Sequence, residues 1–370
     1  MDNDTGTRPL SPKLKSLLDK FDAGEPLALS RCISLVENQV DGFESLLHTM
    51  HGRLGRARRL GITGPPGAGK STLTSVLVRY FRDRGETVGV IAVDPSSPFT
   101  GGALLGDRVR MDDLATEPGV FIRSMATRGS HGGLSATTRE ATDLMDAFGF
   151  DRIILETVGV GQSELEIASQ ADTTILVLVP ESGDGIQAMK AGLMEVADLF
   201  VVNKADRPGA DRLKKEIEVV NGLRTGRSLA SSSAHHRLDR SILSTERDKT
   251  AREDLPTRSE ETERWESPVL LSVASSGEGI PELAEAVDRH FKWLRDTGEL
   301  ETRRSSAAVE HARMILERTV SRLGTEAWRR WISEAGADAG LAGESPYATA
   351  RRLAGILCPP DSAGEDTARN

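Results

Sequence analysis

The chain has 370 residues, of which 38% are hydrophobic and 28% are charged, and its formal net charge is −9. The acidic balance argues against bulk electrostatic binding to nucleic acid or to an anionic membrane surface. No apolar run reaches the ~18 residues of a membrane-spanning helix, and the two cysteines, Cys32 and Cys358, suit neither a disulfide framework nor a metal site. We therefore expect a soluble, cytoplasmic protein that binds neither nucleic acid nor membrane.

The N-terminal part of the chain divides into two stretches of different character. Residues 1–27 begin with a polar, Pro-containing run without the features of a secretory or transit signal, and we expect a flexible leader. From about residue 27 to 53, apolar residues recur at helical spacing. This pattern predicts an amphipathic N-terminal helical extension over residues 28–56.

Seven short runs rich in Val, Ile and Leu follow, and helical patterns lie between several of them. Most of the runs show no alternation of apolar and polar residues, so both faces of each predicted strand are expected to be buried. The pattern predicts an α/β domain over residues 57–297 with a doubly wound, mostly parallel sheet. The predicted strands are residues 59–63, 88–93, 120–123, 152–156, 174–179, 199–203 and 269–273.

A phosphate-binding motif follows the first predicted strand. Residues 64–71 read Gly-Pro-Pro-Gly-Ala-Gly-Lys-Ser, the complete G-x-x-x-x-G-K-S pattern of a P-loop, and a helix is expected to begin at Ser71. Backbone N–H groups and the helix dipole at such a loop attract phosphate. Lys70 would reach the β and γ phosphates, and the Ser71 hydroxyl would ligate Mg²⁺. The residues expected at the nucleotide here are Gly64, Pro65, Pro66, Gly67, Ala68, Gly69, Lys70, Ser71 and Thr72.

Three acidic residues are candidates for the magnesium shell beside Ser71. Asp94 and Glu156 end the second and fourth predicted strands, and Asp107 follows a Gly-rich loop. Carboxylates at strand ends opposite a P-loop are suitable oxygen ligands for Mg²⁺, directly or through water. Ordinary loop capping is the competing interpretation for Asp94 and Asp107, and an exposed strand-end acid is the one for Glu156. The backbone of Gly159 is expected to meet the γ-phosphate.

The strand at residues 199–203 ends in Asn203-Lys204-Ala205-Asp206, the N-K-x-D pattern that reads guanine. The carboxylate of Asp206 can accept hydrogen bonds from N1–H and the 2-amino group of guanine. Adenine offers neither donor there, which would leave the acid unpaired. Asn203 and Lys204 would brace the loop and cover the base. In the loop after the last strand, Ala274 is expected to contact the guanine oxygen through its N–H, next to Ser275.

The remaining segments lack these motifs. Residues 224–267 are rich in Ser, Arg, Glu and Thr, which predicts a solvated insertion before the last strand. A charged helical pattern predicts a C-terminal helical extension over residues 298–358, and residues 359–370 are expected to be a disordered tail. The seven histidines form no set with metal-ligand spacing.

Longer strings of sequence carry a family resemblance. Residues 156–164, Glu-Thr-Val-Gly-Val-Gly-Gln-Ser-Glu, closely resemble switch II of the methylmalonyl-CoA mutase-associated GTPases, a family that includes bacterial mutase chaperones and cobalamin A-type proteins. These are P-loop GTPases with Glu in the switch II motif. The resemblance runs from about residue 29 to about residue 304. Further matching strings are residues 93–97, 101–108, 127–129, 132–134, 183–187, 190–192 and 197–198.

The resemblance implies a G domain that dimerises through helical extensions and uses GTP to gate cobalamin delivery to a partner acyl-CoA mutase and to protect that mutase. It also implies roles for particular residues. Those expected to take part in hydrolysis are Lys70, Asp107, Glu156 and Lys190, those in the metal shell are Ser71, Asp94, Asp107 and Glu156, and those expected to respond to the partner are Gln162, Asp184, Gln187 and Lys190. The 224–267 stretch is longer than the family suggests, and His131 stands where an apolar residue is expected.

Two other functions fit parts of the sequence. A transport-associated ATPase or kinase would share the P-loop, but adenine would leave Asp206 unpaired. A nickel-enzyme metallochaperone GTPase would share the fold, but such proteins generally carry His-rich or Cys-bearing metal sites. Slow intrinsic GTP hydrolysis is expected, because no residue is clearly placed to orient the attacking water.

Overall fold

The computed structural model describes residues 10–94, 112–126, 133–157, 170–180, 193–224 and 264–335, together with residues 347, 348, 350, 351 and 354. The P-loop, the base motif and the strands that carry them all lie within these ranges. Most of residues 224–267 and the whole predicted tail lie outside them.

A seven-stranded sheet forms the centre of the molecule, and every strand pair in it is parallel. The spatial order is β3-β2-β4-β1-β5-β6-β7. The doubly wound, mostly parallel sheet predicted from the apolar runs is therefore confirmed. The strands are β1 Arg58–Thr63, β2 Val88–Asp94, β3 Val120–Ala126, β4 Arg152–Thr157, β5 Thr173–Leu178, β6 Leu199–Asn203 and β7 Val269–Ser272.

Helices cover both faces of this sheet, which explains why the central strands contain continuous apolar runs rather than alternating apolar and polar residues. On one face, α4 (Lys70–Asp83) and α11 (Ile280–Asp296) pack on β1, β2, β4 and β5. On the other face, α6 (Gly133–Phe148) packs together with the N-terminal helices. Three further helices lie in the described part of this region: α5 Asp112–Ala115, α9 Leu193–Val196 and α10 Ala210–Arg224.

The N-terminal region differs from the flexible leader expected up to residue 27. Helix α1 spans Pro12–Asp22, and Ser11 caps it by accepting a hydrogen bond from the Leu14 N–H at 3.4 Å. Leu18 and Phe21 are buried in the same core as the helix that follows, α2 (Pro26–Glu37). The few apolar residues of α1 thus pack against α2, and composition alone did not predict this contact.

The helical extension expected over residues 28–56 consists of separate helices in the structure. After α2 the chain turns through Gln39 at φ 48°, in the left-handed region that commonly follows a helix end, and then through Gly42 at φ 91°, which is the N-cap of the next helix. Val40, which fitted the helical spacing, is 43% exposed in this turn. The chain then continues as α3 (Phe43–Met50) and the 3₁₀ helix η1 (His51–Arg53).

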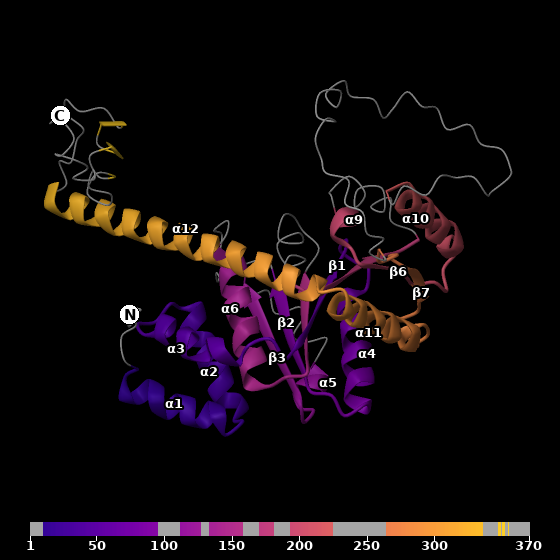
Figure 1. Cartoon of the computed structure of the whole chain (residues 1–370), viewed down its shortest axis with the longest axis horizontal. Helices are drawn as coiled ribbons and strands as arrows, with labels where there is room; N and C mark the ends of the chain where they lie inside the picture. Colours follow the sequence, from indigo (N-terminus) through magenta and orange to yellow (C-terminus); the bar gives the residue numbers. More distant parts are fainter. Residues whose placement is uncertain are drawn as a thin grey trace, which may run out of the picture.

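The described part of the C-terminal extension contains one long helix, α12 (Glu299–Ala335), which follows α11, runs along α6 and projects beyond the N-terminal helices (Figure 1). The predicted C-terminal helix is present over these residues, whereas most of residues 336–358 lie outside the described part. No helix in the described ranges combines the length and the apolar character needed to cross a lipid bilayer.

Candidate functional site

The sequence motifs meet at one edge of the sheet. In a parallel sheet all carboxyl ends of the strands lie at the same edge, and ligands bind there where the strand order reverses. The P-loop follows β1, Glu156 lies near the end of β4, and the base motif follows β6. These motifs are far apart in the sequence, but the topology brings them together.

Two glycines of the P-loop are required by close packing. Gly64 has φ 141°, and a Cβ there would lie 2.1 Å from the carbonyl oxygen of Val177 on the neighbouring strand β5. Gly69 has φ 86°, and a Cβ there would lie 2.5 Å from Nδ2 of Asn203. A side chain at either position would therefore push the phosphate loop away from the strand or from the base loop.

Lys70 is the first residue of α4 and is buried beneath the P-loop. Its Nζ donates hydrogen bonds to the carbonyl oxygens of Gly64 at 2.7 Å and Pro65 at 3.0 Å. The ammonium group thus lies inside the curve of the loop, where the phosphates of a nucleotide would bind. The loop carbonyls position this charge, and a phosphate oxygen would give it a stronger partner.

Ser71 and Glu156 form the described part of the candidate metal site. The Ser71 Oγ donates to Glu156 Oε1 at 2.6 Å, and both side chains are buried. Glu156 pairs in register with Ile62 on β1 and Ala92 on β2, so it faces the P-loop helix from the middle of the sheet. A buried hydroxyl and carboxylate in contact are the hard oxygen donors that suit Mg²⁺, and this pair fits such an ion. The interpretation of Glu156 as an exposed strand-end acid is wrong.

Asp94 ends β2, two positions beyond Ala92, the register partner of Glu156. Its backbone therefore lies at the same edge of the sheet as the candidate metal site, while its side chain lies outside the described part. Its role as a magnesium ligand stays a prediction.

The base motif is bonded directly to the P-loop. Asn203 Nδ2 donates to the carbonyl oxygen of Ala68 at 2.8 Å, and Lys204 Nζ donates to that of Gly67 at 2.8 Å. Lys204 has a left-handed backbone with φ 56°, so the chain turns sharply after β6 and Asp206 lies exposed beyond the turn. The phosphate and base loops are therefore parts of one hydrogen-bonded unit, and Asp206 is accessible to a base.

The loop after β7 completes this unit through Asn203. Asn203 Oδ1 accepts hydrogen bonds from the Ala274 N–H at 3.1 Å and from Ser272 Oγ at 3.2 Å, and the Ala205 N–H donates to the Ser272 carbonyl. Ala274 is thus next to the base motif as expected, although in this structure its N–H bonds to Asn203. The bracing role of Ser272 was missed, and the signal for it was a lone hydroxyl residue at the end of an apolar strand.

Several predicted site residues lie outside the described part of the chain, and their roles stay predictions. They are Asp107, Gly159, Gln162, Asp184, Gln187 and Lys190, together with the family departure His131.

Comparison with known proteins adds to this geometry. The model of the family "Methylmalonyl Co-A mutase-associated GTPase MeaB" matches residues 29–328. A protein of Pyrococcus horikoshii that is named as a GTPase is 43% identical over 84% of this chain and 87% of its own length. GTPase ArgK of Escherichia coli is 37% identical over 83% of this chain and 85% of its own length.

Two further comparisons are more distant. The mouse protein named methylmalonic aciduria type A homolog, mitochondrial, is 34% identical over 67% of this chain and 52% of its own length. The crystal structure of an LAO/AO transport system kinase aligns with a TM-score of 0.60 at 26% identity, covering 95% of this chain and 99% of that one.

Proposed function

Because this chain belongs to the family of methylmalonyl-CoA mutase-associated GTPases, we propose that it uses GTP to gate cobalamin loading and protection of a cobalamin-dependent acyl-CoA mutase. GTP hydrolysis itself is the activity of the family and of its named relatives. The observation that supports the partner is the family match, which extends over nearly the whole chain rather than the G domain alone.

The described residues support a division of labour in nucleotide binding. The P-loop N–H groups and Lys70 would bind the phosphates, while Asp206 would select guanine. Asn203 would fix the distance between the two ends of the nucleotide, since it contacts the P-loop and the loop after β7 at once. Such preorganisation reduces the entropy lost when the nucleotide binds.

We further propose that Mg²⁺ is bound by Ser71 and Glu156, with Asp94 and Asp107 completing the shell. A bound Mg²⁺ would neutralise charge on the phosphates during hydrolysis. Glu is one methylene longer than the Asp usual at this position in GTPases. In this chain that length lets the carboxylate of Glu156 contact the Ser71 hydroxyl directly.

The partner is tested by measuring phosphate release with and without a purified cobalamin-dependent mutase from the same organism. A partner that prefers one nucleotide state must bind the GDP and GTP forms differently, and it changes turnover if it orders the loops around the γ-phosphate. We expect at least about tenfold stimulation, equivalent to about 1.4 kcal/mol off the barrier. Gln187→Ala or Lys190→Ala should reduce the stimulated rate and leave the intrinsic rate nearly intact.

The result that contradicts the chaperone function is equally definite. If no mutase stimulates turnover and none forms a nucleotide-dependent complex, the mutase partner is wrong, while the GTPase activity is unaffected. We also propose a cytoplasmic location and a homodimer formed through the helical extensions, as the family resemblance implies.

The rival functions have direct tests. One rival is an ATP-dependent function, which the name of the LAO/AO transport system kinase suggests. Competition between ATP and GTP for the site tests it, because Asp206 should reject adenine. Equilibrium dialysis with Ni²⁺ and Zn²⁺ tests the nickel metallochaperone.

A further inference from the structure

Helix α12 contacts the rest of the molecule mainly through polar groups. Of its larger apolar side chains between residues 299 and 333, only Leu300 and Met314 are buried, and six others are well exposed. Apolar burial normally supplies most of the free energy that binds a helix to a domain. The contact between α12 and the body therefore depends on a few charged side chains, and their arrangement along the helix is uneven.

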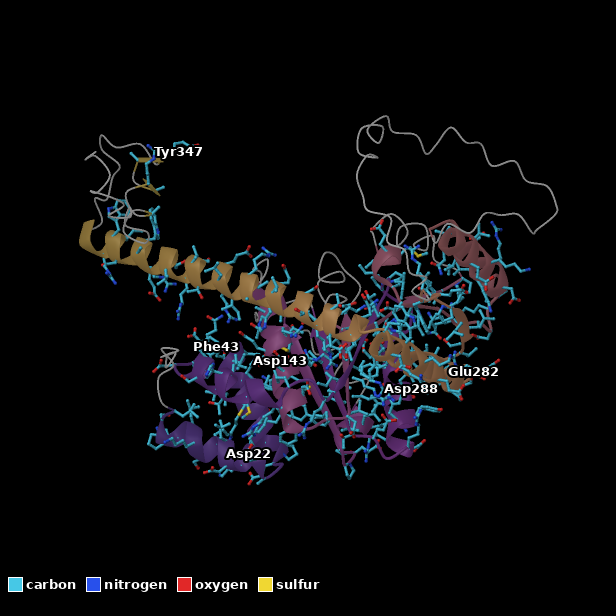
Figure 2. All side chains as sticks on the ribbon, viewed as in Figure 1. Asp22, Phe43, Asp143, Glu282, Asp288 and Tyr347 are labelled. Carbon is cyan, nitrogen blue, oxygen red and sulfur yellow. The ribbon has the colours of Figure 1, made fainter. Side chains whose placement is uncertain are left out.

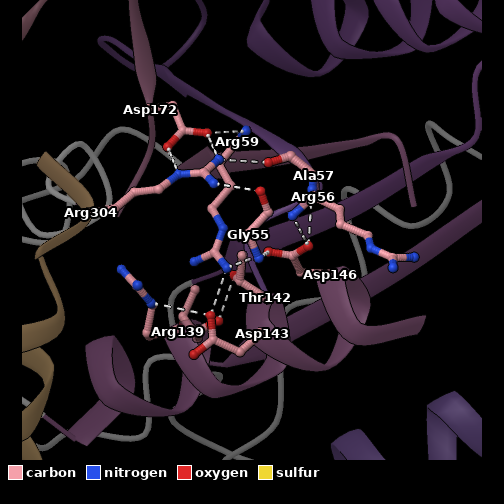
Figure 3. Close-up of polar contacts among 11 residues, drawn as sticks. Gly55, Arg56, Ala57, Arg59, Arg139, Thr142, Asp143, Asp146, Asp172 and Arg304 are labelled. Atoms are coloured by element: carbon pink, nitrogen blue, oxygen red, sulfur yellow. Dashed lines mark hydrogen bonds and ion pairs between the residues drawn. The ribbon is translucent and has the colours of Figure 1, made fainter. Parts of the chain in front are cut away.

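The first part of α12 is bound by many hydrogen bonds from two adjacent arginines, which we call the arginine root. Arg303 donates to both carboxylate oxygens of Asp198 at 3.0 Å. Arg304 donates to both carboxylate oxygens of Asp172 at 2.8 and 2.7 Å and to the carbonyl oxygens of Gly55 and Ala57 (Figure 3). Paired N–H bonds of this kind hold the first turns of the helix on the sheet edge and on the segment before β1.

One further ion pair, fourteen positions along the helix, connects α12 to α6, and we call it the latch. Arg318 donates to both oxygens of Glu140, at 3.0 and 2.6 Å, and Glu140 is almost completely buried. The Arg318 guanidinium also lies 5.5 Å from the ring centroid of Phe43 on α3, which lies on the side of α12 that faces the body (Figure 2). No ion pair or side-chain hydrogen bond of the described residues joins α12 to the body beyond Arg318.

Between the root and the latch, the contact contains buried nitrogen atoms that make no hydrogen bond. They are Nε of Arg139 on α6 and Nε2 of His311 on α12. The Nε atom of Arg139 lies 3.3 Å from Oδ1 of Asp143. Arg139 is only 9% exposed, and this burial lowers the pKa of the Arg139 guanidinium in spite of the nearby carboxylate. Burial likewise lowers the pKa of His311 to about 4. Each of these groups would gain water as a partner if the two helices separated.

The latch itself does not offset this cost strongly. Burial raises the pKa of the Glu140 carboxyl even though Arg318 is bonded to it, so the carboxylate is poorly compensated. A buried ion pair gains attraction but loses hydration, and the two effects nearly cancel. The distal contact between α12 and α6 therefore depends on this one ion pair, whereas the arginine root is bound by hydrogen bonds to several groups.

We propose that α12 pivots at its arginine root and that the Arg318–Glu140 latch switches its distal half between a closed and a released position on α6. In the closed position the latch covers Glu140 and Phe43. In the released position both become accessible, and the exposed apolar residues of α12 change direction relative to the G domain.

The distance between two spin labels tests this device directly. The labels are attached at Glu44→Cys on α3 and Arg329→Cys on α12, because both residues are exposed. The full chain also carries Cys358→Ser, and the labelled protein is diluted into an excess of unlabelled protein. Arg329 lies roughly 37 Å along the helix from Arg304 at about 1.5 Å per residue. A tilt of about 15° would therefore move the label by on the order of 10 Å.

Arg318→Gln should shift and broaden the distance distribution by this amount, while Arg313→Gln should leave it as in the parent. Arg313 is the matched control because, among the described residues, its ion pairs reach only Glu310 and Glu317 on the same helix. GDP binding confirms that each variant is folded. If Arg318→Gln fails to bind GDP, Glu140→Gln takes its place. A distribution unchanged from the parent in the folded variant overturns the proposal.

Discussion

Asn203 is the residue at which the three loops of the nucleotide site meet. Its amide donates to Ala68 in the P-loop, and its carbonyl oxygen accepts from Ala274 and Ser272 after β7. A single side chain amide has both donors and an acceptor, so it can join loops from three places in the sequence. This explains why the pattern demands Asn at a position that need not touch the base.

Asp206→Asn tests the residue that selects guanine. We expect GTP binding to weaken by about 2–4 kcal/mol, because the amide loses one acceptor and presents a donor to the guanine N–H groups. Xanthine nucleotides should gain affinity, since their 2-oxo group accepts from the new amide. Calorimetric titration with both nucleotides is the measurement, and Asp211→Asn, an exposed acid on α10, is the control. Parental GTP affinity in Asp206→Asn would show that the base site is wrong.

Ser71→Ala and Glu156→Ala test the candidate metal pair. Each should reduce Mg²⁺-dependent hydrolysis much more than GDP affinity, because both residues act through the ion and the γ-phosphate. The control is Ser75→Ala on the same helix, whose hydroxyl bonds only to the Ser71 carbonyl oxygen among the described contacts. Turnover and GDP affinity are measured over a range of Mg²⁺ concentrations. Equal losses of GDP affinity and turnover would assign the pair a structural role instead.

At the scale of elements, the sheet strands were predictable and the ends of the chain were not. A strand buried on both faces contains a continuous apolar run, so β4, β5 and β6 stand out in the sequence. Helix α1 has only a few apolar residues, and their partners on α2 and α6 come from later in the chain. The break at Gln39 depends on a left-handed turn that a non-glycine residue rarely adopts, so helical spacing concealed it.

In the nucleotide site, too, features with a local sequence pattern were predictable and contacts between distant residues were not. The P-loop and the base motif have local patterns, and the structure places them side by side at the ends of β1 and β6. The contacts of Ser272 with Asn203 and of Glu156 with Ser71 depend on strand order, which joins residues 69 and 85 positions apart. No local pattern specifies such pairs, because the distance between them is set by the whole sheet.

Deletion of residues 225–263 tests whether the rest of the chain folds stably without this segment. The described ends of this segment are tied together, because Asn221 Nδ2 donates to the Ser267 carbonyl at 2.9 Å. Trp265 donates to the Asp198 carbonyl and lies against His290, with ring centroids 4.7 Å apart. Replacing residues 225–263 with a short Gly/Ser linker should therefore change the melting temperature by no more than a few degrees, since loop length affects stability weakly.

The matched variant adds Trp265→Ala to the same deletion. It should lose a further ~2 kcal/mol of unfolding free energy, because the indole packs against His290 and Trp293. Thermal and urea unfolding measure both variants. Unfolding of the simple deletion would show that the segment contributes to the stability of the G domain.

At the scale of the whole molecule, helices from the two ends of the chain meet on one face of the sheet. Residues 55–57, which join the N-terminal helices to β1, donate their N–H groups to Asp146 on α6. Arg304 of α12 bonds to two carbonyl oxygens of the same short segment. The two extensions are therefore connected to each other and to the G domain at one place, although more than 200 residues separate them in the sequence.

The outward face of α12 gives the prediction for the assembly. Val309, Leu316, Val320 and Leu323 are 71%, 62%, 54% and 41% exposed. Their spacing of seven, four and three residues puts them on one side of the helix, away from the arginine root and the latch. An apolar stripe of this kind matches the proposed homodimer, in which a second copy would cover it.

Leu316→Glu combined with Val320→Glu should convert this dimer to a monomer. Burying each apolar side chain contributes about 1.5–3 kcal/mol, so replacing two of them with charges should weaken association by more than about a hundredfold. Ser321→Glu with Thr325→Glu adds the same charge at exposed positions outside the stripe and should leave the dimer intact. Light scattering after size exclusion gives the mass of each variant, and GTP turnover shows that the G domain is folded. If the parent chain is a monomer at micromolar concentration, or if the stripe variant stays dimeric, a second copy does not bind at this face.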